Sequence, residues 1–256
     1  IDEYFSQASV VILNLDMSNY SSVTWICLLL VALGQTIPQG RILGGLAALP
    51  GQFPYQVSVK LNGRHSCGGS IISKNYILSA AHFVSFNTTA GTTYLENGGI
   101  RIPVAETIVH PRYFYEHHNA DIALLRLTTP LTFSRTIQPI VLSSGMVPAN
   151  TPVVISGWGA MWEDGPKPND LQWTILYNLP QGICEFPAGY TLDKLLCLGH
   201  SKEQGICTGD SGGPAVVDNR LVGVASFTVG NSGSNLPDGY VKVSHYLDWI
   251  KKHSDV

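Results

Sequence analysis

The sequence predicts an all-β protein, built as β-barrels or β-sandwiches, and three observations favour this fold class. The 256 residues include 26 glycines and 15 prolines, which is typical of a turn-rich β protein. Charged residues make up 13% of the chain, against about 25% in an average domain. Short segments with strand character recur between turn signals, and a single helix-like segment lies near the C-terminus.

The elements follow from local patterns. Gln56–Leu61 alternates polar and apolar residues, as a half-buried strand does, and Asn62-Gly63 is a hairpin turn signal. Further strands are expected at 66–72, 76–82, 100–108, 122–127, 153–156, 171–179 and 221–227. Residues 246–253 are expected to form the terminal helix, because Leu247, Trp249 and Ile250 can pack on one side of it.

The N-terminal part predicts a secreted precursor. Residues 23–33 are an apolar run of 11, too short to span a bilayer and of the right length for a signal-peptide core. We expect residues 1–16 to be upstream sequence that the mature protein never carries, 17–34 to be the signal peptide, and 35–41 to be a short propeptide. A buried helix and a membrane anchor are the alternatives for the apolar run. An extracellular location would permit disulfides.

Charge and composition exclude several classes of partner. The net charge is −3 and no block of like charge occurs, so neither a nucleic acid nor a membrane is expected as a partner. The stretch 86–97 has Glu96 as its one acid, a poor calcium loop, and neither a metal nor another cofactor is expected. Asn87-Thr88-Thr89 is an N-glycosylation sequon, expected on a surface loop.

One serine in the chain lies in a setting suited to nucleophilic catalysis. Residues 205–214 (GICTGDSGGP) place Ser211 among four glycines and a proline. Such a turn can direct the N–H groups of Gly209 and Ser211 to one point, where they would stabilise an oxyanion beside the serine hydroxyl. For the turn alone, a plain glycine-rich hairpin is the alternative.

A histidine and an aspartate upstream favour the catalytic interpretation. His82 ends an apolar strand, and Asp121 opens another. A carboxylate at such a position is costly to bury unless it is hydrogen-bonded, and a histidine N–H would satisfy it. The order His82, Asp121, Ser211 also differs from the orders found in subtilisins and in α/β-hydrolases.

These motifs together resemble the chymotrypsin-like (S1 family) serine proteases. The matching strings are RILGG at 41–45, SAAH at 79–82, DIALL at 121–125, GWG at 157–159 and GDSGGP at 209–214. The resemblance covers the chain from Arg41 to its end. It implies two packed six-stranded antiparallel β-barrels, at about 42–146 and 147–245, and a short C-terminal helix at 246–253. It also implies a catalytic triad of His82, Asp121 and Ser211 that hydrolyses peptide bonds.

The resemblance implies activation and partners as well. In S1 zymogens, cleavage at the position of Arg41 frees the α-amino group of the next residue, here Ile42. That group folds inward and pairs with the aspartate before the nucleophile, here Asp210, and removing one partner of such a buried pair costs about 3–5 kcal/mol. The implied partners are polypeptide substrates, an activating trypsin-like protease and protein protease inhibitors.

The substrate pocket implied by the resemblance is unusual. Gly205 lies at the position of the pocket floor, and Asp238 replaces a usual glycine on the opposite wall, a combination that resembles the brachyurin branch with its basic and hydrophobic P1 residues. A solvated loop charge is the alternative for Asp238. Thr228 replaces another glycine, which leaves an elastase-like preference for small P1 residues open. Thr208, Ser226 and Phe227 complete the implied substrate-binding set.

The cysteines depart from the family pattern. Cys184 and Cys197 occupy the positions of a family disulfide, whereas Cys67 and Cys207 have lost their usual partners and are either free thiols or paired with each other. Loss of the two disulfides that Cys67 and Cys207 usually form would weaken the fold. A non-catalytic homologue that acts as a binding module is therefore the alternative function. The remaining histidines are expected to be surface or structural residues: His65, His110, His117, His118, His200, His245 and His253.

Overall fold

The computed structural model describes residue 42 and residues 44–82, 87–113, 120–180, 182–184, 186 and 193–256, all within one unit that spans 38–256. The predicted signal peptide, the propeptide and Arg41 lie outside the described residues. The described strands are β1 (Leu46–Ala47), β2 (Gln56–Leu61), β3 (Arg64–Ile71), β4 (Tyr76–Ser79), β5 (Asn87–Ala90), β6 (Ile100–Val109), β7 (Ala123–Leu127), β8 (Val141–Leu142), β9 (Pro152–Gly157), β10 (Gln172–Asn178), β11 (Leu195–Gly199), β12 (Pro214–Val217), β13 (Arg220–Thr228) and β14 (Asp238–Lys242).

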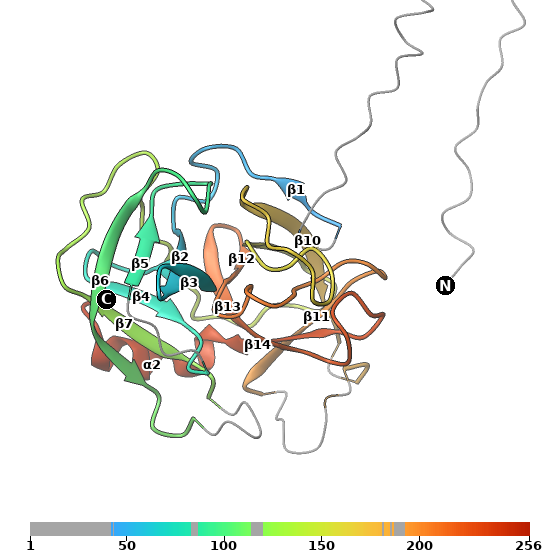
Figure 1. Ribbon diagram of the computed structural model, residues 1–256. Coiled ribbons are helices and arrows are strands. Elements are labelled where there is room, and N and C mark those ends of the chain that lie inside the picture. The colour runs from blue at the N-terminus through green and yellow to red at the C-terminus, as the bar shows by residue number, and fades with distance from the viewer. Residues whose placement is uncertain are drawn as a thin grey trace, which may run out of the picture. The chain divides into compact units, whose positions relative to one another are not determined.

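The first barrel is a closed sheet in the order β2-β3-β4-β7-β6-β5, with every neighbouring pair antiparallel (Figure 1). The predicted hairpin signal joins β2 to β3, and both Asn62 and Gly63 have positive φ, at 51° and 79°. β2 also pairs with β5, at Val57 opposite Ala90, and this pairing closes the barrel. The core of the barrel is aliphatic and includes Val59 and Ile77.

The second barrel is formed by β9, β10, β11, β14, β13 and β12, and the β9–β10 pairing closes it. The expected pair of six-stranded antiparallel barrels is therefore confirmed. The two-residue strands β1 and β8 lie within the range expected for the first barrel, yet β1 pairs with β10 and β8 runs parallel to β13. Ile42 is buried in the core of the second barrel.

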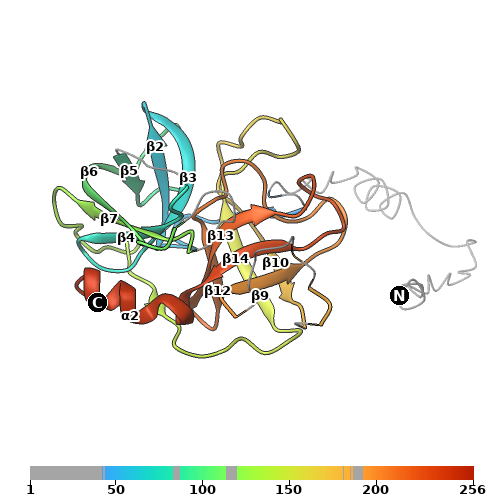
Figure 2. The same cartoon turned by 90° about the horizontal axis from the view of Figure 1, so that it is seen from below.

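The helix α2 (Val243–His253) begins three residues earlier than expected. Val243, Tyr246 and Ile250 are its buried residues, and they share one apolar cluster with Leu78 of the first barrel and Val224 of the second. In Figure 2 the helix leads away from β14 and lies beside β4 and β7 of the first barrel. None of the helices among the described residues is both long and apolar enough to cross a membrane.

The sequon at residue 87 is not on a surface loop, so that expectation is wrong. Asn87 begins β5, and Thr88 and Thr89 are buried. The three residues pair with β2 on one side and with β6 on the other, because β5 is the strand that completes the first barrel.

Candidate active site

His82 and Asp121 form a close pair in the first barrel. Asp121 lies just before β7 and is fully buried, and its Oδ2 lies 2.6 Å from Nδ1 of His82. Its Oδ1 accepts the backbone N–H groups of Ala81 and His82, both at 2.8 Å. Ala120 adopts a positive φ of 54°, so the turn that aims the carboxylate inward is a conformation that non-glycine residues rarely adopt. The two backbone N–H groups stabilise the ionised form of the Asp121 carboxylate, which burial alone would disfavour.

Ser226, a predicted substrate-binding residue, has a side-chain contact that the sequence did not predict. It lies on β13 of the second barrel, and its Oγ donates to Oδ2 of Asp121 at 2.5 Å. The two residues are 105 positions apart in the chain, and no local pattern signals such a contact. Asp121 is therefore held from both barrels.

The turn that carries Ser211 depends on glycine conformations. Gly209 has a φ of 106° and Gly212 a φ of 79°, and both values are strained for residues with a Cβ. The Gly213 N–H donates to the Asp210 carbonyl at 2.8 Å, and Gly68 of the first barrel donates to the Ser211 carbonyl, also at 2.8 Å. Within the described part of the chain, neither the N–H of Gly209 nor that of Ser211 donates to a protein acceptor. Two backbone donors thus remain available beside the hydroxyl.

The side chain of His65 contacts the turn that carries Ser211. Its Nε2 lies 3.0 Å from the Gly209 carbonyl, which can only accept, so Nε2 carries the proton and Nδ1 accepts from Ser58 Oγ at 2.9 Å. Burial lowers the pKa of His65 to about 3, with the charge of Lys167 as a further cause. The ring is therefore neutral at physiological pH. The sequence indicated a surface or structural residue, and the contact spans 144 positions that no motif connects.

Asp210 is buried behind the nucleophile turn. Its Oδ1 accepts the Gly159 N–H at 2.7 Å, and its Oδ2 accepts the Cys207 N–H at 3.0 Å. A Cβ on Gly157 or on Gly159 would overlap the carboxylate, which explains both glycines of the GWG string. Burial raises the pKa of Asp210 to about 6, although its backbone hydrogen bonds and Lys167 oppose the shift. A cation brought next to this carboxylate would therefore stabilise the turn.

Asp238 is a buried residue of β14, so its interpretation as a solvated loop charge is wrong. Its Oδ2 accepts the Ile206 N–H at 2.8 Å and lies 3.5 Å from Nε2 of His200. Gly205 has a φ of 109°, and a Cβ there would lie 2.6 Å from Asp238 Oδ2 and 2.7 Å from His200 Nε2. The predicted pocket floor is thus covered by a histidine–aspartate pair that the sequence did not indicate.

The other predicted pocket residues lie at the end of β13 and in the turn. Thr228 pairs in register with Asp238, and its Oγ1 donates to the Gly230 carbonyl at 3.3 Å. The Phe227 ring covers Gly239, where a Cβ would overlap it. Thr208 is exposed, and its carbonyl accepts the Ala160 N–H at 2.9 Å.

The cysteines divide as the family pattern implied. Cys184 and Cys197 form a disulfide with a Cα–Cα distance of 6.2 Å. Cys67 and Cys207 are free and buried, so the alternative in which they pair with each other does not occur. Burial raises the pKa of both free thiols, which keeps them protonated and unreactive.

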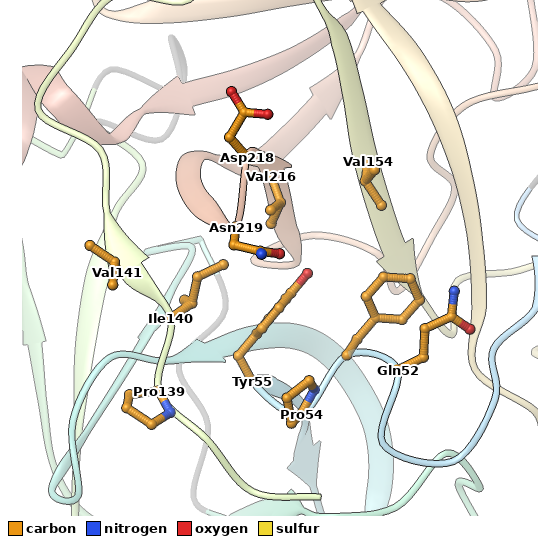
Figure 3. Close-up of a pocket in the computed structure, with 11 residues that line it drawn as sticks. Gln52, Pro54, Tyr55, Pro139, Ile140, Val141, Val154, Val216, Asp218 and Asn219 are labelled. Carbon is orange, nitrogen blue, oxygen red and sulfur yellow. The ribbon is translucent and has the colours of Figure 1, made fainter. Parts of the chain in front are cut away.

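The structure also has a pocket apart from His82, Asp121 and Ser211, and its described residues form no cluster that could hold a metal. A pocket of about 480 Å³ is lined by both barrels, and Figure 3 shows the Tyr55 side chain pointing towards Asn219 across it. None of His82, Asp121 and Ser211 lines that pocket. Among the described residues, no group of three or more His, Cys, Asp or Glu side chains comes together as a metal site would require.

Comparison with known proteins agrees with this geometry. The family model described as Trypsin matches residues 42–250. Serine protease SP24D of Anopheles gambiae is 41% identical over 82% of this chain and 80% of its own length. Trypsin delta of Drosophila erecta is 35% identical over 87% of this chain and 95% of its own. The solved structure of neuropsin, a serine protease expressed in the limbic system of mouse brain, superposes with a TM-score of 0.78 at 31% identity, covering 81% of this chain and 97% of neuropsin. The chain belongs to the trypsin family and is a serine endopeptidase.

Proposed function

We propose that the protein is a secreted endopeptidase made as a zymogen, with residues 17–34 as its signal peptide and 35–41 as its propeptide. Cleavage after Arg41 by a trypsin-like protease would free the amino group of Ile42. Ile42 is already buried in the second barrel, and Asp210 is a buried carboxylate with backbone donors alone among its recorded hydrogen-bond partners. An ammonium ion next to that carboxylate would offset the cost of burying it.

The contacts of His82 and Asp121 support the following catalytic roles. His82 would take the proton of Ser211 as Oγ attacks the peptide carbonyl, and would then deliver it to the departing amine as the C–N bond breaks. Water would hydrolyse the resulting acyl-enzyme with the same base. Asp121 would hold the imidazole tautomer and stabilise its charged form. The N–H groups of Gly209 and Ser211 would bind the oxyanion. The observation that carries this proposal is the His82–Asp121 pair, supported by Ser226 from the barrel that holds Ser211.

Substrates would bind beside the end of β13. Ser226, Phe227 and Thr228 would present backbone groups to an extended peptide, as an added strand does. Thr208 and Gly205 would line the P1 pocket with Asp238, and a broad, brachyurin-like choice of hydrophobic and basic P1 residues would result. An elastase-like choice of small P1 residues is the competing specificity.

Labelling with an active-site probe tests this proposal. The full precursor is treated with trypsin, the new N-terminus is sequenced, and a fluorophosphonate probe is added. We expect Ile42 as the N-terminus and labelling of Ser211, with none in Ser211→Ala and none in Arg41→Gln, which trypsin cannot cut at this site. If the correctly cleaved chain takes no fluorophosphonate label, the catalytic proposal is contradicted and a binding module is favoured. Labelling of the uncut Arg41→Gln precursor would contradict the zymogen proposal.

A further inference from the structure

A second histidine–aspartate pair lies at the base of the proposed P1 pocket. The side chains of His200 and Asp238 are 1% and 3% exposed, and Nε2 of His200 lies 3.5 Å from Oδ2 of Asp238. Both atoms lie over Gly205, whose missing Cβ leaves the space for them. Any role of this pair in selecting substrates rests on the proposed function, because it requires that pocket to bind the P1 side chain.

The hydrogen bonds of His200 determine which form the pair adopts. Nδ1 lies 2.9 Å from the Ser201 carbonyl, which can only accept, so Nδ1 carries a proton. Nε2 is buried and, within the described residues, has no hydrogen-bond partner. In a neutral ring Nε2 would direct a lone pair at the Asp238 carboxylate. The observed arrangement is therefore favourable when the pair holds one further proton, on Nε2 or on the carboxyl group, and the two sites titrate as a unit.

The surroundings favour retention of that proton. Asp238 accepts the Ile206 N–H. Its charge also acts on the Asp210 carboxyl group and on the Tyr240 hydroxyl, and neither of these groups is a cation. Burial raises the pKa of Asp238. Burial lowers the pKa of His200, but its interaction with the Asp238 carboxylate outweighs this and raises the pKa overall.

The charged side chains on the loop of His200 are directed elsewhere. Lys202 and Glu203 are both exposed. Lys167 acts electrostatically on Asp210, and its Nζ donates to the His65 carbonyl at 2.9 Å. Among the described residues, His200 is therefore the one group that can bring a positive charge to Asp238.

We infer that His200 is a specificity-determining residue, acting as a buried counter-ion that decides whether the P1 pocket presents a negative charge. With its proton, the pair has no net charge, and the pocket accepts apolar P1 side chains. Without that proton, Asp238 is a bare carboxylate and stabilises an arginine or lysine side chain at P1. Binding of a cationic P1 residue and release of the proton are then coupled, and each favours the other.

The pH dependence of substrate choice tests this inference on the activated wild-type enzyme. Two peptides that differ only in having arginine or leucine at P1 are compared from pH 5 to pH 9, and the ratio of their kcat/KM values is followed. Both peptides are cleaved by the same proposed catalytic groups, so any pH dependence of the chemical step cancels in the ratio. We expect the arginine-to-leucine ratio to rise with pH with a limiting slope of about one log unit per pH unit, as loss of a single proton requires.

Variants separate the counter-ion from a structural role. In His200→Gln the amide can still donate to Asp238 but carries neither a charge nor a titrating proton, so the ratio should lose the wild-type pH dependence, and any dependence that remains would be that of the Asp238 carboxyl group alone. In Asp238→Asn the ratio should be low and independent of pH. His245→Gln, which changes an exposed histidine of α2, should keep the wild-type profile. The wild-type profile decides the matter even if a variant fails to fold.

Three outcomes would overturn the inference. They are a flat ratio in the wild type, an unchanged pH dependence in His200→Gln, and an enzyme that hydrolyses only peptides with small P1 residues at every pH. A cleaved chain that hydrolyses no peptide and takes no fluorophosphonate label would instead contradict the proposed function.

Discussion

The two histidine–aspartate pairs use the same side chains in opposite ways. Asp121 accepts two backbone N–H groups and the Ser226 hydroxyl, and it lies 2.6 Å from Nδ1 of His82. Asp238 has one backbone donor, and it lies 3.5 Å from Nε2 of His200. The donors around the first carboxylate stabilise its ionised form. The second depends on its histidine for neutrality.

The difference shows that the number of donors around a buried acid decides what its histidine does. Because Asp121 is already stabilised by three donors, His82 is suited to the role of general base that we propose for it. Because Asp238 has few donors, the proton on His200 is retained to balance charge. The His82–Asp121 pair is therefore suited to transferring a proton during turnover. The His200–Asp238 pair is suited to controlling the charge at the proposed substrate pocket.

Replacing each acid by its amide gives the largest effect and the sharpest contrast. Asp121→Asn should lower kcat by about 10⁴-fold at neutral pH for every substrate, the loss known for this substitution in a serine protease triad, because the imidazole then adopts the wrong tautomer. Asp238→Asn should change the preference among P1 residues instead. Steady-state kinetics on arginine and leucine peptides measure both. Equal losses of kcat in the two variants would break the distinction.

Gly205→Ala tests whether the second pair needs the space above a glycine. The new Cβ would lie 2.6 Å and 2.7 Å from polar atoms of the pair, on a backbone with a φ of 109°. We expect the free energy of unfolding to fall by about 2–3 kcal/mol, from overpacking and backbone strain together. Urea denaturation measures this loss. Gly145→Ala is the control, because its Cβ meets nothing within 4 Å, and a similar loss in both variants would count against the close contact.

Ser226→Ala tests the third donor to Asp121 and should have the smallest of these effects. Loss of a hydrogen bond to a charged group should lower kcat/KM about tenfold, without changing P1 preference. The control is Ser156→Ala, which also removes a buried hydrogen bond between the barrels, from Ser156 Oγ to Gln56 Oε1 at 2.7 Å, but away from Asp121. That variant should lose stability and keep its kcat. Equal kcat/KM losses in both variants would place the effect in barrel packing.

Local sequence predicted much of the fold and left particular elements out. Strands with alternating or continuous apolar residues, such as β2 and β9, were predicted nearly to their ends. The sequence of β5 is a polar sequon and that of β14 begins with Asp238-Gly239, so neither segment shows a strand pattern. Both are strands because they pair on each side, β5 with β2 and β6, and β14 with β11 and β13. The start of α2 at Val243 was missed because the periodic residues begin at Tyr246.

The candidate site divides in the same way. The proposed catalytic residues His82, Asp121 and Ser211 could be named from the sequence, because each lies in a local string. His65 and His200 lie in no such string, and their partners Gly209 and Asp238 are brought to them by the folding of distant segments. The sequence predicted that Asp238 either lines the pocket or is solvated. Only the register of β14 against β11 and β13 buries it.

The two barrels touch backbone to backbone where the site is assembled. Gly68 donates to the Ser211 carbonyl, and a Cβ on Gly68 would lie 2.8 Å from the Cα of Gly213. His82 and Asp121 belong to one barrel, whereas Ser211 and Ser226 belong to the other. Neither half of the polypeptide, taken alone, contains both the proposed nucleophile and its proposed base. The proposed active site thus lies at the contact between the two halves, and it is complete only while they remain docked.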